Sequence, residues 1–385
     1  AQDLPSGASS RIYKDGHKWV EEITGSLPGA RSLYVKTLAG GIQVTGGPQS
    51  EITYIIRKRA YKVDQVEAGR LFQGLRIAAS SRGGKAVFEA DWPQSQRNNS
   101  VSAEFILRVP RELASADLRT AGGGIQVRDI AGSVEADTKG GGLELSEIGG
   151  SVNAVTAGGG INVGNVGGDV IVDTLGGGIR VRSVQGRLKA VTAGGSVDVG
   201  TAHQAAELRT SGGSIQVTEC SGDLHATTAG GAIEVGNAGS VVFLNSAGGG
   251  IRIGGAKGRV TATTAGGGLK LLNLTHGVKA ETASGGIVAE FVGIGKNFTP
   301  SELATTVGDV VVYLPAELAV TVRALVDLGD GYRIFSDFPE LKISSEGGSY
   351  GPKQIWAEGL LNGGGPLLKL RTSAGNITIR RGKQQ

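Results

Sequence analysis

The chain has 385 residues, of which 39 are basic and 35 acidic, so its formal net charge of +4 is a small surplus. This balance gives no reason to expect nucleic acid as a partner. No run of 18 apolar residues occurs, so we expect no transmembrane helix. The chain has one cysteine and no methionine, so it forms no internal disulfide and offers little to oxidise. Cys220 lies among apolar positions and is predicted to be a core residue.

Residues 1–30 carry no repeat, and we treat them as an N-terminal arm. The segment HKWVEEI predicts a strand or a helical turn. An Ala-Gln start without methionine is typical of what signal peptidase leaves. We therefore expect an exported protein, extracellular or on the cell surface, with the periplasm as the alternative.

Residues 31–116 contain a first coil and an elaborated cap. The phrase LYVKTLAGGIQV predicts the coil, and the segment after it predicts strands at 51–58, 75–79 and 85–90, a short helix at 64–73, and a strand that ends at Pro110. The basic run at 57–59 is interpreted as a solvated strand end.

Residues 117–292 repeat one phrase ten times, with a constant displacement of 18 residues. A period of this kind decides the fold before any other feature. Position 0 of each copy is a Thr, or Ser in one case. These anchors are Thr120, Thr138, Thr156, Thr174, Thr192, Thr210, Thr228, Ser246, Thr264 and Thr282.

Apolar residues occupy positions −4, −2, +5, +7 and +10 of the copies, with polar residues between them. Spacings of two are typical of strands that have one buried face. A unit of two short strands cannot bury that face alone, but a stack of identical units can. The prediction is an all-β fold: a single-stranded parallel β-helix, or β-solenoid, with 18-residue coils and elaborated capping ends. Parallel crossovers favour a right-handed coil, and a chain of antiparallel hairpins is the alternative.

Glycine fills position +3 in all ten copies and position +2 in nine. Because Gly weakens regular structure, two such columns indicate that the structure requires Gly at these positions. Either the turn requires positive φ, or successive turns approach too closely for a Cβ. The predicted turn residues are Gly123, Gly141, Gly159, Gly177, Gly195, Gly213, Gly231, Gly249, Gly267 and Gly285.

Residues 293–385 are predicted to hold the C-terminal coils and a second cap. Thr305, Val310 and Val312 fit one coil, and the phrase LLKLRTSAGNITI fits the last. Between them lie the segment TVRALVDL and a loop-rich stretch at 329–365.

Aromatic residues divide the chain, because only Phe243 lies between Asp117 and Ala289, whereas nine of the 18 lie before Pro110 and eight lie after Ala289. The ends of a solenoid are exposed sheet edges that need cover. We therefore expect these aromatics to form caps, with an interface to a neighbouring molecule as a compatible alternative. The candidate interface residues are Tyr13, Trp19, Trp92, Phe335, Phe338 and Trp356. Contact between unlike ends would not close and would grow as a fibre, so a homo-oligomer or head-to-tail filament is predicted.

The search for chemistry gives no catalytic residue, no metal ligands and no cofactor site. The four histidines lie in unrelated phases of the repeat, and no His, Cys and carboxylate grouping has metal-ligand spacing. We expect a protein that is not an enzyme. One alternative is a carbohydrate-binding or carbohydrate-cleaving β-helix, with its site where 57–100 and 329–365 fold over a sheet. Another is a periplasmic monomeric scaffold. Partners in these cases would be a surface glycan or a protein.

The repeated T-x-GG-I-x-V coils, the strand FILRVP before DLRTAGGGIQV, and the final LRTSAGNITI resemble a bacterial family. This is the putative-adhesin family of Gly-rich β-solenoid envelope proteins, a domain-of-unknown-function type. The resemblance covers about residues 30–382. It implies an exported β-solenoid and supplies no catalytic residues.

Overall fold

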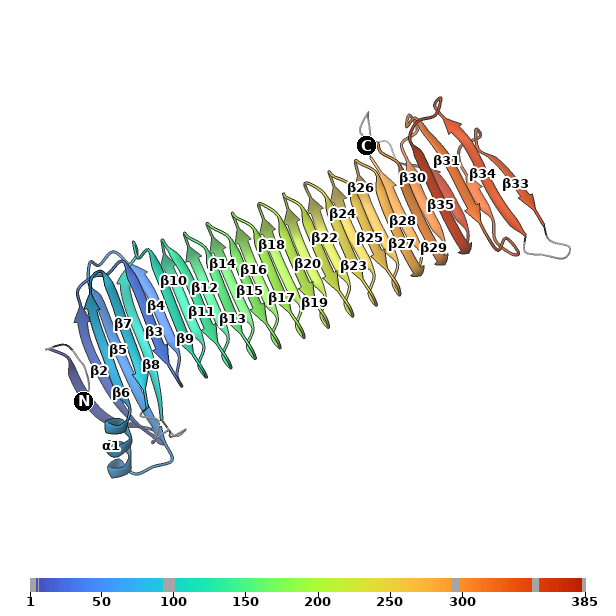
Figure 1. The fold of residues 1–385 in the computed structure, drawn as a ribbon. Helices are drawn as coiled ribbons and strands as arrows, with labels where there is room; N and C mark the ends of the chain where they lie inside the picture. The colour runs from blue at the N-terminus through green and yellow to red at the C-terminus, as the bar shows by residue number, and fades with distance from the viewer. Residues whose placement is uncertain (1–4, 6, 93–100, 293–297, 348–352, 383–385) are drawn as a thin grey trace. The chain divides into compact units, whose positions relative to one another are not determined.

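The computed structural model describes residues 5, 7–92, 101–292, 298–347 and 353–382. The chain forms two compact units, Ala1–Gly195 and Ser196–Gln385, and the boundary falls within the predicted regular stretch. Each unit contains a β-solenoid segment, in which every coil gives one strand to a sheet A and the next strand to a sheet B (Figure 1).

In unit 1, sheet A contains the strands that end at the Thr column, and sheet B contains the strands after the Gly turn. Sheet A has the order β6 (Arg76–Arg82), β7 (Lys85–Asp91), β3 (Ser32–Thr37), β9 (Ser115–Thr120), β11 (Ser133–Thr138), β13 (Val152–Thr156), β15 (Val170–Thr174) and β17 (Leu188–Thr192). Sheet B has the order β1 (Ser9–Asp15), β2 (Lys18–Leu27), β5 (Ile52–Tyr61), β8 (Val101–Pro110), β4 (Ile42–Gly47), β10 (Ile125–Ile130), β12 (Leu143–Ile148), β14 (Ile161–Val166) and β16 (Ile179–Val184).

Unit 2 is likewise built of a sheet A and a sheet B. Its sheet A has the order β19 (Ala206–Thr210), β21 (Leu224–Thr228), β23 (Val242–Ser246), β25 (Val260–Thr264), β27 (Val278–Ser284), β29 (Ser301–Val307), β35 (Leu367–Ala374), β31 (Val320–Val326), β34 (Gln354–Leu361) and β33 (Lys342–Glu346). Its sheet B has the order β18 (Val197–Ala202), β20 (Ile215–Cys220), β22 (Ile233–Ala238), β24 (Ile251–Ala256), β26 (Leu269–Leu274), β28 (Ile287–Phe291), β30 (Val310–Leu314), β36 (Ile377–Arg381) and β32 (Ile334–Ser336).

The coils stack in parallel and in register. Thr138 pairs with Thr156 in sheet A, and Leu143 pairs with Ile161 in sheet B, which is a step of one 18-residue copy in both cases. Equivalent residues of successive copies therefore lie above one another at the interstrand spacing of roughly 4.8 Å. This confirms the solenoid and excludes the hairpin alternative for these coils.

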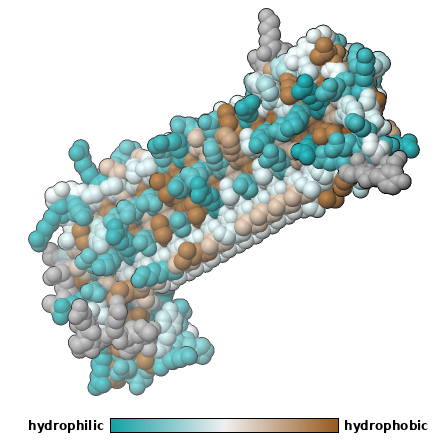
Figure 2. Space-filling view, turned by 45° about the vertical axis from the view of Figure 1, so that its right-hand side comes forward, coloured by the Kyte–Doolittle hydropathy of each residue, from teal (hydrophilic) through white to brown (hydrophobic). Residues whose placement is uncertain are grey.

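The core lies between the two sheets and is made of the predicted columns. In the coil around Thr156, for example, Val152, Ala154, Ile161 and Val163 are all buried. Residues between these columns face outward, and Figure 2 shows polar side chains along the visible face with apolar ones scattered among them. The two-residue period of burial follows from the alternation of side chains along a strand.

The end coils do not stack in sequence order. In unit 1, the first coil (β3 and β4) lies between the β9/β10 coil and a coil made of β7 and β8. In unit 2, the last coil (β35 and β36) lies between the β29/β30 coil and strands β31 and β32. The predicted coil columns are confirmed. In unit 1, however, β7 and β8 follow the first coil in the chain and stack on its outer side. In unit 2, β31 and β32 precede the last coil in the chain and stack on its outer side.

The predicted short helix is α1 (Gln65–Gly74), which packs against β5 and β2 in unit 1 (Figure 1). The Asp64 side chain accepts a hydrogen bond from the Glu67 backbone N–H and so caps the helix start. Among the residues described, no helix has the length and apolar character needed to cross a bilayer.

Candidate functional site

The Gly column at position +3 is required by close approach between turns. A Cβ on Gly177 would overlap the carbonyl group of Gly159 in the preceding coil. Of the ten predicted turn glycines, Gly285 alone has positive φ, so backbone conformation explains only that one. Position +2 is less restricted, because a Cβ on Gly176 would lie 3.4 Å from the Gly158 oxygen, an ordinary contact.

The Thr column links each turn to the preceding one. The Thr156 hydroxyl donates to the Gly141 carbonyl at 2.8 Å and accepts the Gly159 backbone N–H at 3.2 Å. In unit 2, Ser246 makes the same two bonds, to Gly231 and from Gly249. Because these buried hydroxyls are hydrogen-bonded, the cost of removing them from water is offset. We call this series of bonds the Thr–Gly spine.

From the sequence alone, the Thr residues were recognised only as markers of the 18-residue period. Their role could have been predicted, because a polar side chain at a buried phase of the repeat needs a partner in every coil. In the Thr–Gly spine, these partners are the backbone groups of the +3 glycines.

The three N-terminal interface candidates lie in different places. Tyr13 and Trp19 are half-buried on the β1–β2 hairpin, where the pairing of Tyr13 with Val20 and of Lys14 with Trp19 puts the two rings on opposite faces. The Lys14 ammonium lies 5.9 Å from the Trp19 ring centre. Trp92 is buried within unit 1. The structure does not bring these three aromatics together as one surface.

A network of charged residues covers the outer face of the N-terminal strands. Glu22 is almost fully buried and accepts bonds from Arg57 at 2.9 Å and Arg11 at 2.6 Å. The hydrogen bond from Arg57 lowers the pKa of the Glu22 carboxyl, with a further contribution from Arg11 against the effect of burial. Beside it, Arg59 pairs with Glu104 at 2.6 Å. The network holds β1, β2, β5 and β8 together side by side.

The interpretation of 57–59 as a solvated strand end is wrong for Lys58, which is fully buried. Its ammonium donates to the Phe72 carbonyl at 2.8 Å and lies 2.9 Å from a Glu21 carboxylate oxygen. Desolvation lowers the pKa of Lys58, although Glu21 acts in the opposite direction. Phe72 is in the last turn of α1, where backbone carbonyls lack helical partners. Lys58 therefore ties the end of α1 to the sheet.

The C-terminal candidates are also distributed. Phe335 lies on β32 and is 49% exposed, whereas Phe338 is buried with the Arg381 guanidinium 5.4 Å from its ring centre. Trp356 is half-buried on β34, in the other sheet. Trp92 and Phe338 are thus packing residues of their own units. The role of the other four as interface residues stays a prediction.

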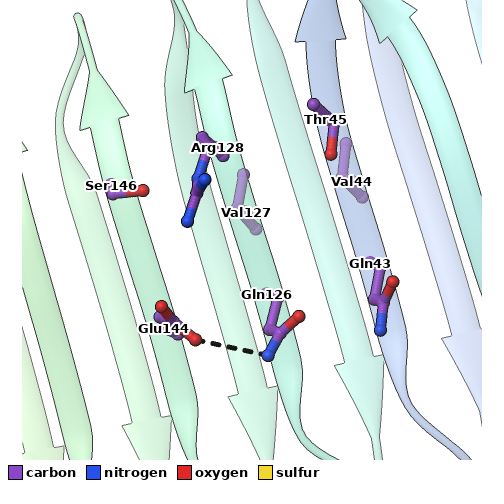
Figure 3. Close-up of a pocket in the computed structure, with 8 residues that line it drawn as sticks. All are labelled: Gln43, Val44, Thr45, Gln126, Val127, Arg128, Glu144 and Ser146. Carbon is purple, nitrogen blue, oxygen red and sulfur yellow. Dashed lines mark hydrogen bonds between the residues drawn. The ribbon is translucent and has the colours of Figure 1, made fainter.

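A shallow hollow of about 270 Å³ lies on the outer face of sheet B in unit 1 (Figure 3). Polar side chains from three adjacent coils line it, and Val44 and Val127 form its base. Gln126 donates to Glu144 at 3.2 Å, and the side chain of Arg128 has no hydrogen bond or ion pair among the residues described. The polar lining is Gln43, Thr45, Gln126, Arg128, Glu144 and Ser146. The carbohydrate site considered from the sequence was expected where 57–100 and 329–365 fold over a sheet, and this hollow lies elsewhere.

The single aromatic between Asp117 and Ala289, Phe243, is also on a solvated face. Phe243 stacks on His225 of the preceding coil, with ring centres 4.8 Å apart. The sequence offered the signal, since both residues occupy position −3 of adjacent copies.

The reactive groups of the described residues give no metal or thiol site. No group of three or more His, Cys, Asp or Glu side chains in the described ranges is arranged to hold a metal ion. Cys220 is buried as predicted, and desolvation raises the pKa of its thiol to about 11. The sulfur contacts backbone carbonyls of Gln204 and Gly222. It is therefore a core residue with little thiolate at neutral pH.

No family model and no curated protein matches the chain. Among solved structures, it is similar to a "putative cell adhesion protein" from Clostridium sporogenes ATCC 15579, with 11% identity, a TM-score of 0.18, and coverage of 94% of this chain and 100% of that one. It is similar to a "putative adhesin (BF0245)" from Bacteroides fragilis NCTC 9343, with 10% identity, a TM-score of 0.24, and coverage of 99% and 100%. A third is a "putative adhesin" from Parabacteroides distasonis ATCC 8503, with 10% identity, a TM-score of 0.27, and coverage of 76% and 95%.

These neighbours carry the same description as the family that the sequence resembles.

Proposed function

We propose that this chain is an exported, non-enzymatic β-solenoid with a structural or adhesive role at the cell surface. The observation that carries the proposal is the Thr–Gly spine, in which the recurring buried polar side chain of each coil is used to hold one turn on the next. A fold in which the repeated polar groups form hydrogen bonds between successive coils is suited to a rigid scaffold. The outer faces and the ends are then the parts that remain for contact with other molecules.

The adhesive part of the proposal comes from the coil phrases that resemble bacterial envelope adhesins. Export is supported by a composition with no methionine and one cysteine, which leaves little to oxidise outside the cell. The head-to-tail fibre stays a prediction, which electron microscopy of the purified chain would test.

Beads coated with the full chain test the adhesive role. We expect them to attach to surfaces coated with bacterial or host glycans and matrix proteins, above beads coated with an unrelated protein of similar charge. Equal attachment of both bead types on every surface would contradict the proposal.

The hollow in Figure 3 favours glycan binding as a second candidate. Amide and hydroxyl groups from adjacent coils lie there beside one guanidinium, a donor and acceptor array that suits sugar hydroxyls. Its lining includes one carboxylate, Glu144, whereas glycoside cleavage usually uses a pair, so the hollow supports binding over cleavage. Glycan-array binding that is lost in Arg128→Ala and kept in Arg182→Ala, an exposed arginine outside the hollow, is the expected result. Equal binding by both variants would remove the hollow as the site.

A further inference from the structure

The edge strand β33 differs from the rest of its sheet. It is the outermost strand of sheet A in unit 2, paired to β34 on one side only among the residues described. All five of its residues are exposed, whereas every other strand of that sheet has buried residues. Ile343 is 49% exposed although it shares a face with the buried Ala357. An edge of this kind presents free backbone N–H and C=O groups to another strand.

The charges on β33 are self-complementary. Lys342 and Glu346 lie at its two ends, and their spacing of four residues puts both on the outer face. Neither side chain has a hydrogen bond or ion pair among the described residues. If the strand pairs antiparallel with its own copy about Ser344, each Lys342 lies opposite a Glu346. Opposite charges directly across a strand pair stabilise it, and like charges destabilise it.

We infer that β33 pairs with β33 of a second copy of this chain, antiparallel and centred on Ser344. The contact is two-fold symmetric, so it closes as a dimer and does not grow as a fibre. It joins the two A sheets through their edges, with Ser345 opposite Ile343 on the inner face. The inference rests on the proposed function, in which the ends of the chain make the contacts, and it names the partner of one end.

Another free edge, β1, suits β33 less well. β1 pairs only with β2 among the described strands, and an antiparallel register would place its Arg11 and Asp15 opposite Glu346 and Lys342. Both β1 charges already have partners, however, since Arg11 lies 2.6 Å from Glu22 and Asp15 lies 3.1 Å from Lys18. On β33, Lys342 lies opposite only Glu358, which already pairs with Arg323 at 3.3 Å, and Glu346 lies opposite the uncharged Gln354, which favours the symmetric pair.

Charge reversal tests this pairing on the full chain by sedimentation velocity over a concentration series. Because a five-residue contact is small, we expect a weak wild-type dimer, seen at high protein concentration. Lys342→Glu and Glu346→Lys each turn two attractive pairs into repulsive ones, so each should raise the midpoint concentration for dimerisation by roughly tenfold or more. An equal mixture of these two variants should dimerise like the wild type, because a mixed pair restores both contacts.

The double variant Lys342→Glu/Glu346→Lys separates the two possible partners of β33. It should dimerise like the wild type if β33 pairs with itself, whereas pairing with β1 would be lost because both charge pairs become repulsive. Loss of assembly in the double variant, assembly that neither charge reversal weakens, or a wild-type chain that stays monomeric at every concentration would each overturn the inference. Bead attachment does not depend on this contact, so a failed dimer with successful adhesion contradicts the inference and leaves the proposed function standing.

Discussion

The regular coils of unit 1 and its N-terminal end are built from the same two sheets but are held together differently. From Ser115 to Val184, each residue lies above its equivalent in the preceding coil, and the Thr–Gly spine repeats at every turn. From Ser9 to Pro110, the contacts are antiparallel strand pairs, buried aromatic rings and ion pairs, and none of these contacts repeats from coil to coil. A repeated contact depends on a column of residues, whereas a single contact depends on a particular pair.

The difference explains where each region is vulnerable. In the coils, a substitution is tolerated or rejected according to its column, because all members share one environment. At the N-terminal end, the cost of a substitution depends on the buried charge or ring that it leaves without a partner. Four substitutions separate these two behaviours.

The largest effect is expected from Gly177→Val in the coils. Its side chain would overlap the Gly159 carbonyl and force two turns apart, so we expect a loss of roughly 5 kcal/mol in the free energy of unfolding. Gly176→Ala, one residue earlier, is the matched control and should cost less than about 1 kcal/mol. Urea unfolding followed by circular dichroism measures both. Equal losses would show that the two Gly columns are not distinguished by close approach.

At the N-terminal end, Lys58→Ala is expected to cost about 3 kcal/mol, because it leaves Glu21 and the Phe72 carbonyl without their buried partner. Arg70→Ala changes an exposed cation on α1 and serves as the control, with an expected change within about 0.5 kcal/mol. The same urea measurement applies. If Lys58→Ala is as mild as the control, the ammonium is solvated and not buried.

Thr156→Val sharpens the account of the spine. It removes a donor to the Gly141 carbonyl and an acceptor for the Gly159 N–H, so we expect a loss of about 2 kcal/mol. Thr156→Ser keeps both bonds, as Ser246 does in unit 2, and should lose less than about 1 kcal/mol. Similar thermal midpoints for the Val and Ser variants would contradict a role for the hydroxyl.

The smallest effect concerns pH. The pKa of Glu22 is lowered by its bonds to Arg57 and Arg11, so this carboxylate contributes stability that is fully present above its ordinary value of about 4.5 and is lost as the pH falls through the folded-state value. Glu22→Gln should therefore lose less stability than the wild type between pH 7 and pH 3. Glu51→Gln, an exposed site before β5, should follow the wild type. Parallel pH curves for all three would refute the contribution of Glu22.

The period of 18 allowed much of the fold to be predicted. Columns of apolar residues gave the strands, the in-register stack and the core, and the +3 glycines gave the turns. The end coils fitted the same columns, but their spatial order could not be predicted, because an inserted segment leaves no periodic signal of which coil it covers. The two explanations for Gly could be separated only when the carbonyl of the neighbouring turn was placed.

The candidate sites were less predictable, since they depend on single residues. Lys58 could not be distinguished from Arg57 and Arg59 by composition, and its burial follows from the strand phase that faces α1. Aromatic content identified the two ends of the chain. It did not show which rings are buried, and Trp92 and Phe338 proved to be so. The free edge of β33 was hidden within a stretch that looked loop-rich.

Hydrogen exchange measured by mass spectrometry at low and high protein concentration tests the contrast between stacked coils and contact-forming ends most directly. We expect the amides of β13 and β15 to be strongly protected at both concentrations, those of β33 to exchange quickly at low concentration and gain protection at high concentration, and those of β1 to stay unchanged. Coil amides that exchange as fast as those of β33, or β33 amides that ignore concentration while β1 becomes protected, would contradict the account.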